Sequence, residues 1–190
     1  MAAPPESRSR RALFILLAGL QAGMLGALAL LAWLGVAAVW QRRSFWTSEN
    51  LMASAFYGSA ALGSGLGSRT VSGLALYLLL YSLLGALFAL AVQTRLPRFR
   101  LTLASVLFAL CWYYLSFQVI WKAFAPLITR LHVETPTIWG HIIYGAMLGR
   151  YPVYLPRMEK TAPSSAEPAT EGSPAPEPPA GETGQETRDP

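Results

Sequence analysis

Long apolar runs alternate along the chain with short segments that hold nearly all of its charge. The first run, residues 12–40, contains no charged side chain, and Gln21 is its only strongly polar member. A helix of that length rises about 43 Å, more than the roughly 30 Å hydrocarbon core of a bilayer. A soluble domain of this size could not bury such a segment. The pattern therefore predicts an integral membrane protein.

Three further apolar segments predict additional spans at residues 71–92, 101–121 and 136–155. The last is short, and it reaches spanning length only if the helix continues beyond Arg150 with the arginine snorkelling to the interface. The alternative is a half-inserted helix that packs against the others. We predict an all-α fold, a polytopic transmembrane four-helix bundle with a short interfacial or re-entrant helix and a disordered C-terminal tail.

Lysine and arginine residues flank these spans unequally, and their distribution predicts the orientation. The richer side holds Arg8, Arg10, Arg11, Arg95, Arg98, Arg100, Arg150, Arg157 and Lys160, and the poorer side holds Arg42, Arg43, Arg69, Lys122 and Arg130. Because positive residues accumulate on the cytoplasmic side, we expect cytoplasmic termini at residues 1–11 and 156–190 and a cytoplasmic loop at 93–100.

The two connectors on the outer side of the membrane have different predicted structures. Within residues 41–70, Ser48 is a candidate N-cap for a helix over 49–62 that lies on the membrane surface or, alternatively, dips in as a re-entrant loop. The loop 122–135 is interrupted by Pro126. The tail 156–190 is rich in proline, glutamate and alanine, a composition that predicts disorder.

The formal net charge is +5. Because the basic residues flank apolar spans, we interpret them as topology signals and lipid-headgroup contacts, and we expect no nucleic-acid partner. The chain has 1 cysteine, Cys111, so an intramolecular disulfide is excluded.

Small residues at four-residue spacing mark the expected packing faces of the first and last spans. They let helix backbones approach closely in lipid. The packing positions are Gly19, Gly23 and Ala27 in the first span and Gly145 and Gly149 in the last. The spacing does not distinguish contacts within the chain from contacts in a homo-oligomer, and the presence of four spans in one chain favours the former.

His141 is the main candidate for chemistry, because an ionisable residue inside a membrane segment suggests a functional site. The predicted directions of the spans place Tyr77, Tyr113, Tyr114 and Gln118 at a similar depth, and Tyr144 belongs to the same segment as His141. These residues could form an outward-facing ligand or proton-handling pocket with Glu49 and Asn50 as its lid. Alternatively, a neutral His141 serves only as a helix–helix hydrogen-bond latch.

The sequence predicts no metal site, no cofactor and no catalytic set. His132 and His141 do not share an i, i+4 helix face, and the chain lacks metalloprotease, nucleophile-elbow, P-loop and dinucleotide-binding motifs in a suitable context. The predicted spans contain no aspartate or glutamate, which argues against a proton-driven pump.

Two segments resemble uncharacterised four-helix bacterial inner-membrane protein families: residues 18–23 and the H-x-x-Y-G-x-x-L-G segment at 141–149. The resemblance covers the first and last helices. It implies the four-helix architecture and a location in the bacterial inner (plasma) membrane, and it transfers no activity.

Three functions are compatible with this pattern. The leading hypothesis is a non-enzymatic accessory component that binds the lipid bilayer and a membrane-protein partner or a second copy of itself. The second is a small transporter or channel with a polar site around His141. The third is a membrane-embedded enzyme acting on lipid or quinone, with His141 as base.

Overall fold

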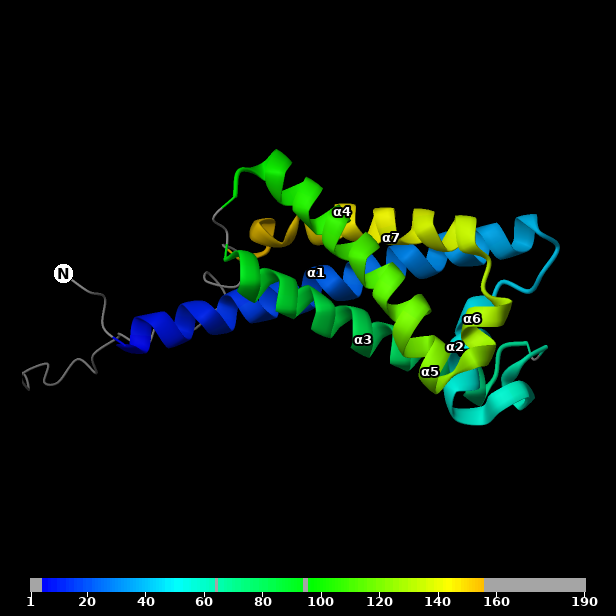
Figure 1. Ribbon diagram of the computed structural model, residues 1–190. Helices are drawn as coiled ribbons and strands as arrows, with labels where there is room; N and C mark the ends of the chain where they lie inside the picture. The colour runs from blue at the N-terminus through cyan, green and yellow to red at the C-terminus, as the bar shows by residue number, and fades with distance from the viewer. Residues whose placement is uncertain (1–4, 64, 94–95, 156–190) are drawn as a thin grey trace, which may run out of the picture.

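The computed structural model describes residues 5–63, 65–93 and 96–155, with side chains from Ser9 onward (Figure 1). In this part of the chain 86% of residues are helical and none is in a strand, which confirms the predicted all-helical class. The predicted tail, 156–190, lies outside the described residues. So do the side chain of Arg8 and the residues Arg95, Arg157 and Lys160, which entered the predicted orientation.

Long helices alternate in direction, so that the described chain begins and ends at one end of the molecule (Figure 1). We call this the terminal end and the opposite one the connector end. The long helices are α1 (Pro5–Trp40), α3 (Ser68–Val92), α4 (Arg98–Leu115) and α7 (Glu134–Leu148). The connector end holds α2 (Thr47–Tyr57), η1 (Gly58–Ala61), η2 (Ser116–Ile120), α5 (Trp121–Phe124) and α6 (Pro126–Leu131).

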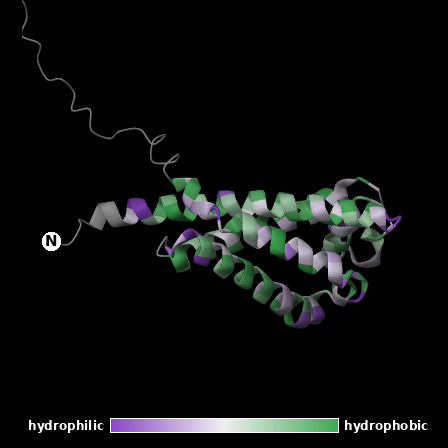
Figure 2. Ribbon diagram, turned by 90° about the horizontal axis from the view of Figure 1, so that it is seen from above, coloured by the Kyte–Doolittle hydropathy of each residue, from purple (hydrophilic) through white to green (hydrophobic). Residues whose placement is uncertain are grey.

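Three segments of the described chain are helical, long and apolar enough to cross a membrane: Ser9–Trp40, Ser68–Val92 and Arg98–Phe124. Figure 2 shows the apolar character along these helices. The fourth predicted span is shorter than expected. Helix α7 has 15 residues, which corresponds to a rise of about 22 Å, and a short turn, η3 (Tyr151–Val153), follows it.

The first glycine stripe lies where α1 crosses α3. A Cβ added at Gly23 would lie 2.5 Å from the Tyr81 carbonyl oxygen, and one at Gly19 would lie 2.9 Å from Ala86 Cα. From the other side, a Cβ at Gly85 would lie 2.7 Å from Gly23 Cα. The two backbones therefore touch, and this contact is internal to the chain.

The second stripe lies where α7 packs on α4. A Cβ at Gly145 would lie 2.6 Å from Val106 Cα, and one at Gly149 would lie 2.9 Å from Thr102 Cα. Ala27 of α1 is fully buried. Helix α1 thus contacts both α3 and α7, and the Trp33 indole N–H donates to the Pro136 carbonyl at 2.9 Å.

The connector helix begins earlier than predicted. Helix α2 starts at Thr47, so Ser48 lies inside it and does not cap it, which corrects the capping prediction. The physical reason is that the turn starts at Ser44, whose carbonyl accepts hydrogen bonds from the Thr47 N–H and the Thr47 hydroxyl. The helix ends at Tyr57, before Gly58 with φ 57°, and not at residue 62.

Helix α2 docks on α3 at Gly73, where an added Cβ would overlap the Glu49 carbonyl oxygen. We expect Gly73→Ala to separate α2 from α3 while the contacts among the long helices persist, because the clash is with backbone that no side-chain rotation can relieve. The measurement is hydrogen exchange of the α2 amides, which should accelerate. Gly65→Ala is the control, because an added Cβ there meets nothing within 4 Å. Unchanged protection in the Gly73 variant would contradict this docking.

Candidate functional site: a buried histidine–tyrosine cluster

Side chains from three helices converge on His141 in the interior of the bundle. Helix α7 contributes His141 and Tyr144, α3 contributes Tyr77 and Tyr81, and α4 contributes Tyr113. The exposed fractions are 1% for His141, 0% for Tyr144 and 3% for Tyr81 and Tyr113. We call these five residues the His–Tyr cluster.

Hydrogen bonds determine the tautomer of His141. Its Nδ1 lies 2.7 Å from the Thr137 carbonyl oxygen, and its Nε2 lies 2.8 Å from the Tyr81 hydroxyl. Because a carbonyl can only accept, Nδ1 carries the hydrogen and donates it to Thr137. In a neutral imidazole Nε2 is then the acceptor, and the Tyr81 hydroxyl donates to it. Both ring nitrogens are therefore satisfied inside the protein.

Further contacts connect the rest of the cluster to this pair. The Tyr144 hydroxyl donates to the Tyr81 carbonyl at 2.8 Å, and the two rings meet edge to face with centroids 4.9 Å apart. The Tyr113 and His141 rings meet edge to face with centroids 5.1 Å apart, and the centroids of the Tyr77 and Tyr81 rings are 5.7 Å apart. Offset and edge-to-face pairs are favourable arrangements for aromatic rings. The cluster ties α3, α4 and α7 together.

The structure brings together four of the predicted site residues, His141, Tyr77, Tyr113 and Tyr144. The sequence analysis missed Tyr81 and Thr137, which make both hydrogen bonds to His141. A signal for each was available. Tyr81 follows Tyr77 by one helical turn, and Thr137 precedes His141 by one turn, so each pair shares a face.

Gln118 does not join the cluster, and Tyr114 touches only its outer edge, which corrects the predicted pocket. Both side chains are exposed, Tyr114 by 54%, although the Tyr114 ring meets the Tyr113 ring edge to face with centroids 5.1 Å apart. Phe117, one turn beyond Tyr113, takes the inward position and is buried, so the next residue is directed away.

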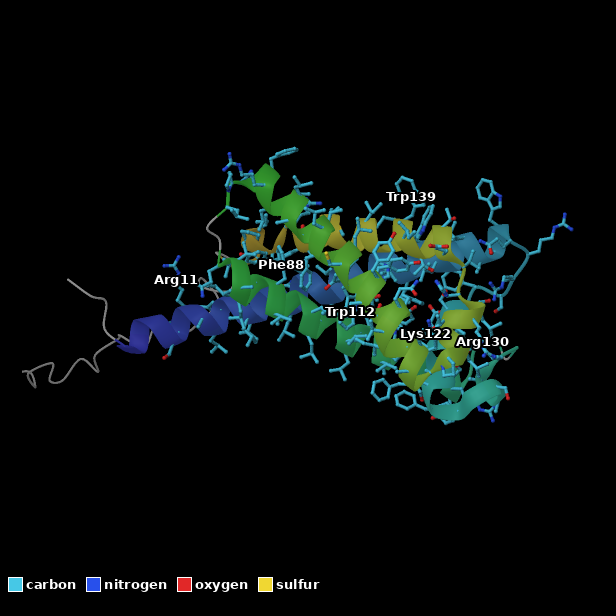
Figure 3. The ribbon with its side chains drawn as sticks, in the orientation of Figure 1. Arg11, Phe88, Trp112, Lys122, Arg130 and Trp139 are labelled. Atoms are coloured by element: carbon cyan, nitrogen blue, oxygen red, sulfur yellow. The ribbon has the colours of Figure 1, made fainter. Side chains whose placement is uncertain are left out.

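Trp112 of α4 is partly buried against the same core, and its indole N–H faces Tyr81 (Figure 3). The buried Nε1 does not reach full hydrogen-bond geometry with Tyr81 or with any other described residue.

Glu49 and Asn50 are not a mobile lid, because both are packed against other side chains with exposures of 2% and 3%. The Thr70 hydroxyl donates to Asn50 Oδ1 at 2.7 Å. Glu49 Oε2 has no hydrogen-bond partner among the described residues. Burial raises the pKa of the Glu49 carboxyl above its ordinary value, although its own backbone N–H acts in the opposite direction.

This raised pKa predicts that the docking of α2 depends on pH. A carboxyl whose pKa rises on docking stabilises the docked state fully below its ordinary pKa, and that contribution is lost as pH rises through the raised pKa. Protection of the α2 amides, corrected for intrinsic exchange rates, should therefore fall as pH rises. Glu49→Gln should remove the dependence because the amide stays neutral.

Other titratable groups near α2 are alternative sources of a pH-dependent docking. From α3, Tyr77 faces Glu49, and Arg69 donates to the Ala60 carbonyl. Neither Arg43, which precedes α2, nor Arg130 of α6 forms an ion pair with Glu49 in the described structure. An equally steep pH profile in the Glu49→Gln variant would assign the effect to one of these groups.

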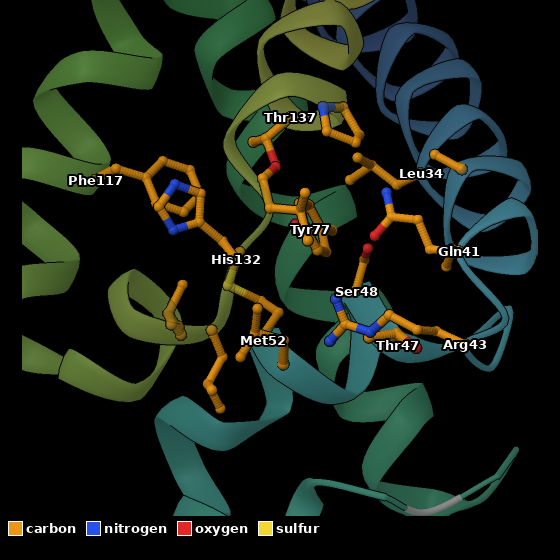
Figure 4. A pocket seen from close by; sticks show the side chains of 17 residues that line it. Leu34, Gln41, Arg43, Thr47, Ser48, Met52, Tyr77, Phe117, His132 and Thr137 are labelled. Atoms are coloured by element: carbon orange, nitrogen blue, oxygen red, sulfur yellow. The ribbon is translucent and has the colours of Figure 1, made fainter.

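Two hollows lie at the connector end and share Arg43, Thr47, Leu51 and Leu131. We call them together the connector hollow. The inner one, with a volume of about 40 Å³, reaches the edge of the His–Tyr cluster, because Tyr77 and Thr137 are in its wall (Figure 4). The outer one, of about 280 Å³, is also lined by Ser44, Asn50, Leu62 and Gly63. His141 itself lines neither.

The described residues contain no group of three or more histidine, cysteine or acidic side chains that could hold a metal ion. Within the His–Tyr cluster the one candidate base, His141 Nε2, already accepts a hydrogen bond from Tyr81. In this arrangement His141 connects helices and has no lone pair directed at a substrate.

No family model, no curated protein and no solved structure matches the chain.

Proposed function

We propose that the chain is an integral membrane protein and acts as a non-enzymatic accessory component, binding a membrane-protein partner or a second copy of itself. The observation that supports this most is the closure of its polar core. Both nitrogens of His141 are engaged by Tyr81 and Thr137 within the protein. A core whose histidine is paired at both nitrogens stabilises a scaffold. An enzyme acting on lipid or quinone would instead need His141 Nε2 free to accept a proton from its substrate.

Helix α4 is the favoured partner face. Only 28% of the apolar stretch in Arg98–Phe124, the segment that begins with α4, is buried, against 44% in Ser9–Trp40 and 39% in Ser68–Val92. Leu103, Leu107 and Tyr114 form an exposed stripe at helical spacing on it. Lipid chains can cover such a stripe without specificity, whereas a partner helix packs against it in one defined orientation. This face of α4 is therefore suited to a helix–helix interface.

A tryptophan scan of two faces tests this proposal. The chain is extracted in mild detergent and its assembly state is measured by blue-native electrophoresis and cross-linking. We expect Leu107→Trp on α4 to dissociate the assembly. Leu83→Trp on α3 is the matched control, because Leu83 is exposed to the same extent, 54%. A monomer with no partner that also shows a turnover activity would contradict the proposal.

The orientation belongs to the same proposal. Arg11 lies at the terminal end, and Lys122 and Arg130 lie at the connector end (Figure 3). We place the terminal end in the cytoplasm of a bacterial cell and the connector end outside the inner membrane, following the excess of positive residues at the former. Reporter fusions at the two chain ends measure this. Reporters on opposite sides would contradict it.

A second candidate, a small carrier or channel, is favoured by one observation: the inner hollow reaches Tyr77 and Thr137 at the edge of the cluster. A pathway past His141 would require the Tyr81–His141 bond to open. If the chain is a carrier, His141→Ala should abolish flux in reconstituted vesicles at unchanged helicity, and Tyr114→Phe, on the exposed side of α4, should not. Vesicles without flux of any tested ion or metabolite would remove this candidate.

A further inference from the structure

The connector hollow combines space with an unpaired positive charge. Arg43 is the only lysine or arginine that lines either hollow, and no carboxylate lines them among the described residues. Its side chain makes no hydrogen bond, ion pair or ring contact with a described residue. Figure 4 shows the guanidinium extending beside Thr47 and below Ser48. An arginine in this setting presents several donors that the protein itself does not use.

Donors of a second kind surround the guanidinium. Ser48 lines the inner hollow, and its hydroxyl has no partner in the described structure. The Ser44 hydroxyl lines the outer hollow and accepts from the Trp46 N–H at 3.3 Å, so its own hydrogen remains available. Charged and hydroxyl donors together suit an anion with several oxygen atoms.

The size of the outer hollow is sufficient for such an anion. One water molecule needs about 10–15 Å³ measured in this way, and the outer hollow offers about 280 Å³. Its apolar lining, made by Leu51, Leu62 and Leu131, suits the carbon atoms attached to an anionic group.

The nearest acid does not oppose an anion here. Glu49 is in the first turn of α2 but lines neither hollow, and its carboxyl is buried on the side of α3. Burial raises the pKa of this carboxyl, which favours its neutral form more than in an exposed glutamate.

The depth of the site indicates what kind of anion it meets. Arg43 follows the end of α1 closely, and Trp40, the last residue of that helix, is 87% exposed. Tryptophan at the end of an apolar span marks the boundary between hydrocarbon and headgroups. Given the membrane insertion of the proposed function, the hollow lies at the level of the lipid phosphates.

We propose that the connector hollow is a phosphate-binding site in which Arg43, which lines both of its parts, holds the anion. Ser44 is an additional donor on the outer side, and Ser48 lies on the inner side. The phosphate belongs to a phospholipid headgroup or is free in solution. In either case the guanidinium makes a charge-assisted pair of hydrogen bonds with two phosphate oxygens.

The test uses the full chain in an uncharged detergent and isothermal titration with three probes: inorganic phosphate, dioctanoyl phosphatidylglycerol and dioctanoylglycerol, which lacks phosphate. We expect saturable binding of at least one phosphate-bearing probe and none of dioctanoylglycerol. Arg43→Gln should weaken that binding about tenfold or more, because it removes charged hydrogen bonds. Binding of the lipid alone assigns the site to headgroups, and binding of inorganic phosphate assigns it to free phosphate.

Arg42→Gln is the matched control, because this neighbouring arginine, exposed like Arg43, lines neither hollow. It should change affinity by less than about twofold, because a charge outside the hollow acts on the anion only through screening water. Arg43→Lys should give an intermediate affinity, because it keeps the charge and loses the planar fork. If Arg43→Gln fails to fold, the comparison of Arg43→Lys with Arg42→Lys replaces it.

Equal weakening in the Arg42 and Arg43 variants would overturn the proposal, and so would the absence of saturable binding of either phosphate probe. Because the titration is made in detergent, it succeeds or fails independently of the assembly and orientation experiments.

Discussion

Replacing Gly85 with alanine is expected to destabilise the bundle by about 1–3 kcal/mol more than replacing Gly140 with alanine. The added Cβ at residue 85 would meet Gly23 Cα at 2.7 Å and Gly23 N at 2.9 Å, and it would overlap the Gly19 carbonyl oxygen. All of these are backbone atoms, so α1 and α3 can relieve the clash only by separating along the contact.

Gly140 is a suitable control because it is also helical but meets only side chains. Its added Cβ would lie 3.3 Å from Leu30 Cγ and 3.5 Å from Trp33 Cδ1, and these side chains can move. Alanine improves helix propensity by about 1 kcal/mol over glycine at both positions. That gain is the same in both variants. The difference between their free energies of unfolding therefore reports the clash with the backbone alone.

The measurement is unfolding in mixed micelles of mild detergent and dodecyl sulfate, followed by the loss of helicity. Equal unfolding midpoints for the two variants would mean that the α1 and α3 backbones are farther apart at Gly85 than in this structure. The glycine stripe would then serve a contact between chains.

Tyr81→Phe is expected to destabilise the protein by about 1–3 kcal/mol, because it leaves the buried Nε2 of His141 without a donor. The ring remains, so its contact with Tyr144 at 4.9 Å persists and the loss is confined to the hydroxyl. Tyr77→Phe is the matched control on the same helix. The Tyr77 hydroxyl has no hydrogen-bond partner among the described residues, and we expect its loss to change stability by less than about 0.5 kcal/mol.

A double-mutant cycle with His141→Leu sharpens this prediction. If the hydroxyl and Nε2 act as a pair, the double variant loses less than the sum of the single losses, because each single variant leaves a buried partner unsatisfied. Strict additivity of the two losses would show that His141 and Tyr81 are not coupled. Loss of flux in Tyr81→Phe vesicles at unchanged stability would instead favour the carrier candidate.

The apolar runs predicted the three helical segments of spanning length well, because length and lack of charge are properties of consecutive residues. The connector helix was less predictable. Ser48 has the chemistry of an N-cap, yet the chain turns at Ser44 and begins α2 at Thr47. The contact of α2 with Gly73 of α3 joins residues distant in sequence, and no local signal encodes it.

The candidate site was predictable in part for the same reason. Tyr77 and Tyr113 were placed near His141 by estimating depth along each helix, and this distance follows from residue number alone. Depth does not give rotation about the helix axis. Gln118 had a suitable depth but lies on the exposed face, whereas Tyr81 lies on the buried face and was missed.

The sequence by itself determined the helical class, the three helical segments of spanning length and the small-residue faces, because each depends on composition or on spacing within one segment. Only the tertiary structure decided which helices those faces meet, how His141 is satisfied and where Arg43 meets the connector hollow. These depend on the rotation and crossing of separate helices, and that geometry comes from the packing of all side chains at once.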